Sequence, residues 1–131
     1  MPFARLTITP TPLQENAQAL AAELTDLIAH DLGKRRDLTS VLVETTGSQV
    51  WTIGASERAS AAHLEVYVTA ETNSEDEKRT FIANAMALLR RAHPNLGAAT
   101  YVVVKQLPAT DWGYDGRTQA DRAKERPMRL R

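Results

Sequence analysis

The sequence has no cysteine, only three histidines and no excess of charge of either sign. Without cysteine there is no disulfide, no thiolate metal site and no cysteine nucleophile. His30, His63 and His93 are widely spaced, so we expect no multi-histidine metal site, no metal and no cofactor. Lys and Arg number 16, as do Asp and Glu, and this balance argues against nucleic-acid or acidic-membrane binding by bulk attraction.

Long hydrophobic runs are also missing. No apolar stretch approaches the roughly 20 residues of a membrane helix, and residues 1–5 lack the apolar core of a secretory signal. We therefore expect a cytoplasmic protein that binds neither membrane nor nucleic acid. The 131 residues, 43% apolar and 24% charged, are typical of one globular domain.

The first half of the chain has the pattern of a β-α-β unit. Apolar residues alternate over 3–9, which predicts a strand with one buried face. After two prolines the spacing changes to three and four residues over 13–32, which predicts an amphipathic helix ended near Gly33. Residues 40–45 are expected to form a second strand, and residues 50–53 a short third one.

The second half repeats this pattern. Residues 63–69 alternate again, Ser74 or Asn73 can cap a second helix, and residues 101–104 (YVVV) are typical of a strand buried on both faces. Trp51 and Trp112 occupy equivalent places. We therefore predict an α+β fold in which tandem β-α-β units form a four-stranded sheet with two helices on one face.

This pattern also sets the expected domain limits. One domain is predicted over 1–116, made of repeats 2–58 and 62–116. Residues 117–131 hold six basic and two acidic residues, and we expect them to form a flexible or loosely docked basic tail. The sheet face opposite the helices would carry Arg5, Thr7, Glu65 and Tyr67, so it needs cover from other subunits.

Pro2 is the residue that most suggests chemistry, because a strand that begins directly after Met-Pro is unusual. Proline in this position normally permits removal of the initiator methionine, which leaves a secondary amine at the start of a rigid strand. A free α-amino group has a pKa of about 7.7–8, and desolvation or nearby cations lower it. Such an amine can take a proton as a base and return it as an acid. Proline is also common here for processing alone.

With these features the sequence resembles the tautomerase superfamily, whose small members include 4-oxalocrotonate tautomerase. The first half carries the resemblance in Pro2-Phe3-Ala4, the helix over 13–32, residues 38–41 and residues 51–54. The second half carries it in residues 64–69, 74–78 and 107–108, and in Trp112-Gly113-Tyr114. The fused length is similar to the malonate semialdehyde decarboxylase and chloroacrylate dehalogenase branches. The resemblance implies a homotrimer, Pro2 as the catalytic acid or base, and a small 2-oxo, enol or unsaturated carboxylate substrate.

The sequence departs from the family pattern where substrate carboxylates are gripped. Pro12 and Leu42 occupy positions at which simple members have arginines, and residues 70–73 contain no arginine where longer members have them. Ala62, which matches Pro2, is internal and is not a free amine. Because lysine does not replace the two-pronged arginine contact, we expect monoacids, aromatic enols included, to be preferred over dicarboxylates.

The resemblance suggests most of the remaining site residues, and Asp111 and Asp115 are candidates because they flank Trp112 and Tyr114. Arg117 is the candidate to grip one carboxylate, although it is otherwise the first residue of the basic tail. Trp112 and Tyr114 either line the cavity or act as packing anchors. The candidate water-orienting carboxylates are Asp37, Asp111 and Asp115, for each of which a turn role is the alternative.

Three functions remain open on this reasoning. The leading hypothesis is an isomerase of the tautomerase type that uses Pro2 as general acid and base. A decarboxylase, hydratase or dehalogenase on the same scaffold is the close alternative. A non-catalytic trimer that binds or assembles, having lost the arginine clamp, is the alternative from a different class.

Overall fold

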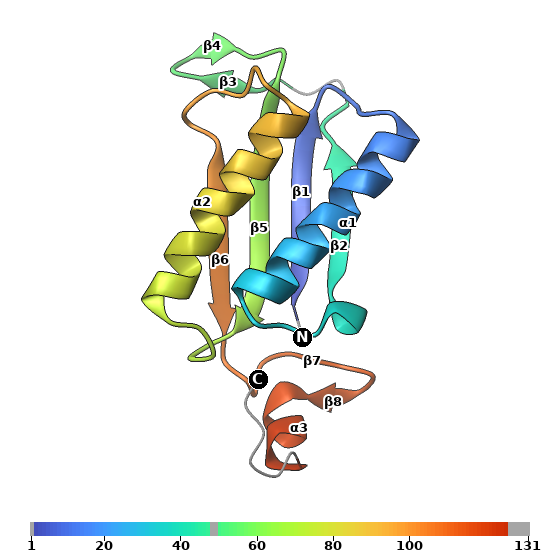
Figure 1. Cartoon of the computed structure of the whole chain (residues 1–131), viewed down its shortest axis with the longest axis vertical. Coiled ribbons are helices and arrows are strands. Elements are labelled where there is room, and N and C mark those ends of the chain that lie inside the picture. Colours follow the sequence, from blue (N-terminus) through green and yellow to red (C-terminus); the bar gives the residue numbers. More distant parts are fainter. Residues whose placement is uncertain (1, 48–49, 126–131) are drawn as a thin grey trace.

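The computed structural model of the chain describes residues 2–47 and 50–125, so Met1 lies outside the described residues. The first half contains β1 (Phe3–Thr9), α1 (Gln14–Asp31), the 3-10 turn η1 (Arg36–Leu38), β2 (Ser40–Thr45), β3 (Thr52–Ile53) and β4 (Ser56–Glu57). The second half contains β5 (Ala61–Thr69), α2 (Glu75–Ala92), β6 (Tyr101–Leu107), β7 (Gly113–Tyr114), β8 (Arg117–Thr118) and α3 (Gln119–Glu125). The predicted tandem of β-α-β units is confirmed (Figure 1).

The four long strands form one sheet in the order β2-β1-β5-β6. Each unit contributes a parallel pair, and the two units join through the antiparallel pair of β1 and β5. The register repeats as well, since Phe3 lies opposite Ser40 and the equivalent His63 lies opposite Tyr101. Both long helices cover the same face of the sheet (Figure 1), which confirms the predicted α+β architecture.

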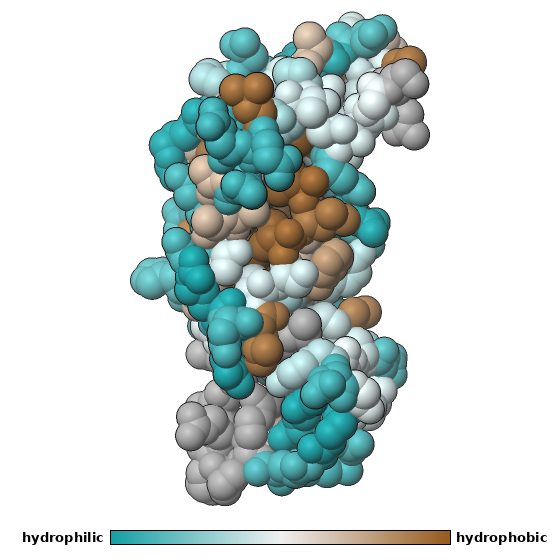
Figure 2. Space-filling model, turned by 90° about the vertical axis from the view of Figure 1, so that its right-hand side faces the viewer, coloured by the Kyte–Doolittle hydropathy of each residue, from teal (hydrophilic) through white to brown (hydrophobic). Residues whose placement is uncertain are grey.

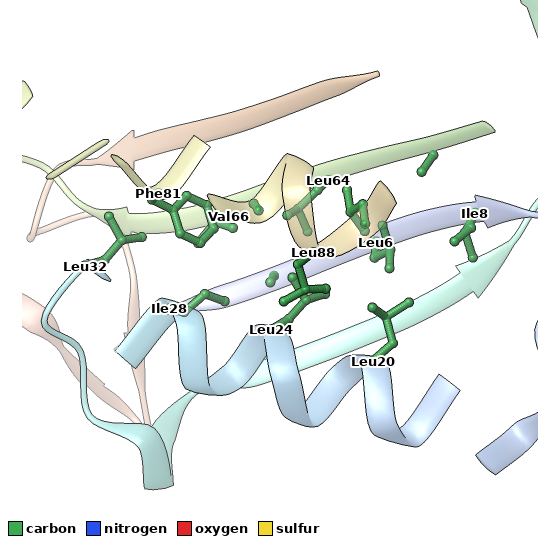
Figure 3. Packing of buried hydrophobic residues seen from close by; sticks show 14 of the residues in the cluster. Leu6, Ile8, Leu20, Leu24, Ile28, Leu32, Leu64, Val66, Phe81 and Leu88 are labelled. Carbon is green, nitrogen blue, oxygen red and sulfur yellow. The ribbon is translucent and has the colours of Figure 1, made fainter. Parts of the chain in front are cut away.

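The core lies between this sheet and the two helices (Figure 3). Alternate residues of β1 and β5 are fully buried, as their period of two requires: Ala4, Leu6, Ile8, Leu64, Val66 and Val68. The buried residues of the helices recur every three or four positions and pack on the sheet: Leu20, Leu24 and Ile28 from α1, and Phe81, Ala85, Leu88 and Leu89 from α2.

The start of α2 is closed by a capping box. Ser74 Oγ accepts a hydrogen bond from Glu77 N at 3.1 Å, and Glu77 Oε1 accepts one from Ser74 N at 2.9 Å. These two bonds satisfy donors that the first helical turn leaves free. Asn73 Nδ2 also donates to Leu32 O at 2.8 Å, which ties the end of α1 to the start of α2.

The sheet face opposite the helices holds a polar cluster around Glu65. Tyr67 Oη donates to the Glu65 carboxylate at 3.0 Å, His63 Nε2 lies 3.0 Å from it, and Lys105 Nζ lies 3.6 Å from it. The hydrogen bond from His63, aided by Tyr67 and Lys105, holds the pKa of Glu65 below its usual range, although burial acts in the opposite direction.

A second polar group on this face joins β1 to the edge strand β2. Thr7 Oγ1 donates to Glu44 Oε1 at 3.0 Å, and Arg5 Nε lies 3.5 Å from the same oxygen. Figure 2 shows apolar surface on the side of the molecule where α1 and β2 lie. On β2, Leu42 is 39% exposed, so an edge strand carries both unpaired backbone groups and apolar surface.

The structure corrects the prediction that residues 101–104 are buried on both faces. They begin β6, which is an edge strand, and Tyr101 is 66% exposed. Val102 and Val104 pack against the core. An unbroken apolar run is typical of a central parallel strand, but in this chain the sheet ends at β6.

Within the predicted basic tail, residues 117–125 have regular secondary structure. Arg117 and Thr118 form β8, which pairs with β7, and α3 follows directly. The predicted boundary after Gly116 falls in the turn of this hairpin. Thr118 Oγ1 accepts a hydrogen bond from Asp121 N at 3.0 Å, which caps α3. The remainder of the predicted tail, 126–131, lies outside the described residues.

Candidate active site

Pro2 is fully buried at the start of β1. Its carbonyl oxygen accepts a hydrogen bond from Ser40 N at 3.2 Å, which fixes it against β2. Phe3 lies opposite Tyr67, so the antiparallel register, continued by one residue, places Pro2 beside Val68 of β5. The side chain of Pro2 is therefore buried between β2 and β5.

The hairpin of β7 and β8, called the second hairpin below, lies at the same end of the molecule as the start of β1 (Figure 1). Trp112 Nε1 donates to Thr69 Oγ1 at 3.2 Å, which ties the hairpin to the last residue of β5. Thr69 follows Val68, the residue that the register places beside Pro2. The structure therefore brings Pro2 and the Trp112 segment to one end of the sheet.

The shape of this hairpin depends on its turn and on Gly113. Asp115 and Gly116 have φ of 51° and 79°, the positive values that a tight two-residue hairpin turn needs. A Cβ on Gly113 would lie 1.9 Å from the Arg117 carbonyl oxygen, so only glycine fits. Asp115 is therefore a turn residue of this hairpin, which is the alternative that the sequence analysis gave for it.

A hollow of about 300 Å³ opens on the hairpin. It is lined by Thr110, Asp111, Trp112, Gly113, Gly116, Arg117 and Thr118, which include three of the candidate residues. Pro2 and Tyr114 do not line it. Its volume is at the lower limit of ordinary ligand pockets, and it is largely open to solvent.

Arg117 and Tyr114 face different partners. The Arg117 guanidinium pairs with the carboxylate of Glu125 on α3. The ring of Tyr114 lies against the guanidinium of Arg122, whose Cζ is 3.9 Å from the ring centroid. Because Glu125 already neutralises Arg117, a substrate carboxylate at Arg117 would have to displace an internal one.

The other candidate carboxylates are engaged locally. Asp37 lies on η1, at the same end of the sheet as Pro2 (Figure 1), and its carboxylate receives two hydrogen bonds from Arg35, at 2.7 and 3.2 Å. Asp111 accepts one from Thr110 Oγ1 at 2.9 Å. Neither Pro12 nor Leu42 lies at this end of the sheet, because Pro12 follows the far end of β1 and Leu42 lies opposite Arg5 in the middle of β2.

Two polar residues of α3 escaped the sequence analysis. Gln119 is only 5% exposed, and Arg122 Nη2 donates to Tyr114 O at 3.0 Å. The available signal was T-x-x-D at Thr118 and Asp121, a helix-start signature that would have predicted α3. The contact between Arg122 and Tyr114 depends on the hairpin, so the local sequence does not reveal it.

Residues 2–47 and 50–125 contain no group of three or more His, Asp or Glu side chains that could hold a metal ion. Within the same ranges, none of the helices is long and apolar enough to cross a membrane.

No protein-family model matches the chain, and no curated protein does either. Solved structures do. A fused 4-OT symmetric trimer matches with a TM-score of 0.80 at 17% identity, covering 90% of this chain and 96% of the other. Pt0534 inactivated by 2-oxo-3-pentynoate matches with a TM-score of 0.80 at 14% identity, over 92% and 98%. A macrophage migration inhibitory factor-like protein from Entamoeba histolytica matches with a TM-score of 0.76 at 19% identity, over 89% and 97%.

These similarities establish the fold. The chain has the tautomerase-superfamily fold in its fused form, with two β-α-β units in one polypeptide, as the resemblance implied. At 14–19% identity they show the fold alone.

Proposed function

We propose that the protein is an enzyme of the tautomerase type, in which the amine of Pro2 acts as general base and acid on a small 2-oxo, enol or unsaturated carboxylic acid. The observation that carries the proposal is the position of Pro2, fully buried at the start of β1 and hydrogen-bonded to Ser40. Desolvation disfavours the charged form of an amine, so the mature Pro2 should titrate below a free α-amino group. Decarboxylation or hydration on the same scaffold is the close variant.

The proposed substrate is a monoacid. The hollow beside Trp112 has a volume of about 300 Å³, which suits a small molecule, and its indole offers apolar surface to the part that is not charged. Pro12 and Leu42 provide no second grip of the kind that a dicarboxylate needs. One structurally similar protein is inactivated by 2-oxo-3-pentynoate, a small unsaturated 2-oxo acid with one carboxylate, which belongs to the proposed substrate class.

The proposed assembly is a homotrimer. The edge strand β2 carries the exposed Leu42, and neither α1 nor α2 covers the polar face around Glu65. A second copy of the chain would pair with the edge strand β2 or cover the polar face around Glu65. A fused 4-OT with the same fold was solved as a symmetric trimer, which supports three subunits over two. Sedimentation at micromolar concentration tests this, and a monomer alone would contradict it.

The function is tested by a turnover screen on small 2-oxo acids and unsaturated acids, with Pro2→Ala as the matched variant. We expect a rate that rises with pH as the Pro2 amine loses its proton, and a large loss of turnover in Pro2→Ala. Undiminished turnover in that variant, or a pH profile without a rising limb, would contradict the proposal. An intact trimer that turns over none of these acids would instead favour the non-catalytic alternative, which the absence of the usual arginines also favours.

A further inference from the structure

His63 lies on β5, one of the two inner strands, on the sheet face that neither α1 nor α2 covers. Its Nε2 is 3.0 Å from Glu65 Oε2. The side chain of His63 is 36% exposed and that of Glu65 is 20% exposed. Both groups therefore meet water in the single chain although they belong to an inner strand, and a layer placed over this face would desolvate them.

The strands around His63 bring further polar groups to the same face. These are Glu65 and Tyr67 on its own strand, Arg5 and Thr7 on β1, Glu44 on β2, and Tyr101 and Lys105 on β6. Arg5 Nε lies 3.5 Å from Glu44 Oε1. Lys105 Nζ lies 3.6 Å from Glu65 Oε1. While His63 is neutral, the two acids and the two bases of this face therefore balance.

Histidine is the side-chain type that ordinarily changes its charge between pH 5 and pH 8. Glu65 stays ionised over this range, because its hydrogen bond with His63, aided by Tyr67 and Lys105, holds the pKa of its carboxyl below the usual value. Arginine and lysine also keep their charge in this range. Protonation of His63 therefore gives the face of each chain one excess positive charge.

We propose that this face is a contact surface between copies of the chain and that protonation of His63 weakens the contact, which makes assembly depend on pH. The inference rests on the proposed homotrimer. A balanced set of charges fits a second copy of itself, because each acid can meet a base across the contact. One excess positive charge on every copy instead brings like charges together where little water remains. The pair of His63 and Glu65 lies within one chain, so it is present before and after assembly.

The chain offers a clean comparison because it has only three histidines. His30 belongs to α1, where its side chain is 88% exposed, and His93 directly follows α2. Both therefore lie in the helix layer, away from the polar sheet face. A pH effect that arises on this face should vanish when His63 alone is replaced.

The test is sedimentation of the full chain over a range of concentrations at pH 7.5 and pH 5.5, at one ionic strength. The concentration at which half of the chains are assembled should rise by about tenfold or more at pH 5.5, the effect of like charges meeting in a contact. His63→Gln keeps a polar side chain but cannot become charged, so it should assemble equally at both pH values. His30→Gln should behave as the wild type does. The amine of Pro2 is unchanged in both variants.

A second variant reverses the sign of the effect. Lys105→Gln leaves the face with one excess negative charge while His63 is neutral and balances it once His63 is protonated. This variant should therefore assemble more strongly at pH 5.5 than at pH 7.5, which a general weakening of the fold by acid does not produce. Circular dichroism at both pH values checks that each variant is folded.

Three results would overturn the inference: equal assembly of the wild type at both pH values, a pH effect that persists in His63→Gln, or an effect of unchanged sign in Lys105→Gln. A monomer under all conditions would refute the proposed trimer as well. Turnover separates this inference from the proposed chemistry. Turnover that depends on Pro2, with assembly that ignores pH, refutes the inference alone. Assembly that depends on His63, without turnover, refutes the proposed chemistry alone.

Discussion

The hydrogen bond between Trp112 and Thr69 ties the second hairpin to the end of the sheet where Pro2 lies, and its removal should have a measurable cost. Trp112→Phe deletes the Nε1–H that donates to Thr69 Oγ1 at 3.2 Å. A hydrogen bond of this kind contributes about 0.5–1.5 kcal/mol, and the smaller ring also leaves unfilled volume. We therefore expect Trp112→Phe to lower the free energy of unfolding by about 1–3 kcal/mol.

A double-mutant cycle isolates the hydrogen bond from the loss of volume. Thr69→Val removes the acceptor with little change of shape. Because each single variant loses the same bond, the double variant should lose about 0.5–1.5 kcal/mol less than the sum of the two. Urea unfolding followed by circular dichroism measures this, at one protein concentration since assembly contributes to stability.

The matched control is Trp51→Phe, the equivalent tryptophan of the first half, combined with Thr69→Val. These two residues share no hydrogen bond that the structure records, so their effects should add. A coupling between Trp112 and Thr69 below about 0.3 kcal/mol would show that the hairpin is held by other contacts. The reasoning that places it beside Pro2 through this bond would then fail.

Three further variants test the fold around the site. Because the pKa of Glu65 is lowered from 4.5 in the folded chain, its contacts stabilise the fold fully above pH 4.5 and are lost as the pH falls through the lowered pKa. Glu65→Gln should therefore reduce the fall in melting temperature between about pH 6 and pH 3. An unchanged fall would show that the contacts of Glu65 do not stabilise the fold. Ser74→Ala removes the cap of α2 and should cost about 1 kcal/mol in urea unfolding, whereas Ser56→Ala on an exposed strand should cost little. Gly113→Ala should distort the second hairpin and cost about 1–3 kcal/mol, while Gly97→Ala, whose new Cβ meets only the movable Arg58 side chain, should cost less; equal losses would refute the backbone clash.

Much of the fold could be predicted because the spacing of apolar residues distinguishes strands from helices and identifies their buried faces. The alternation of Leu6 and Ile8, and of Val66 and Val68, identified strands whose inward residues are fully buried. The apolar run from Tyr101 misled, because local sequence does not say whether a strand is central or at an edge. The burial of β6 on one face follows from the number of strands in the sheet.

The site was only partly predictable because its contacts join distant residues. Pro2 was proposed because a strand begins directly after Met-Pro, and Trp112 because of the family resemblance; the structure brings their segments to one end of the sheet. Gln119 and Arg122 belong to a short helix with no apolar stripe, so hydrophobic spacing gave no sign of it. The burial of Gln119 and the contacts of Arg122 with Tyr114 exist only once α3 is placed beside the hairpin of β7 and β8.

The central claim is that Pro2 carries a free, reactive amine, and covalent labelling with 2-oxo-3-pentynoate tests it most directly. The unprotonated amine would add to the alkyne, forming one C–N bond while its proton passes to the adjacent carbon, with no leaving group. Peptide mass analysis after labelling near neutral pH should show an N-terminal peptide that begins at Pro2 and carries one inhibitor molecule, formed more slowly as the pH is lowered. A retained Met1, an adduct on another residue, or no adduct would contradict the account.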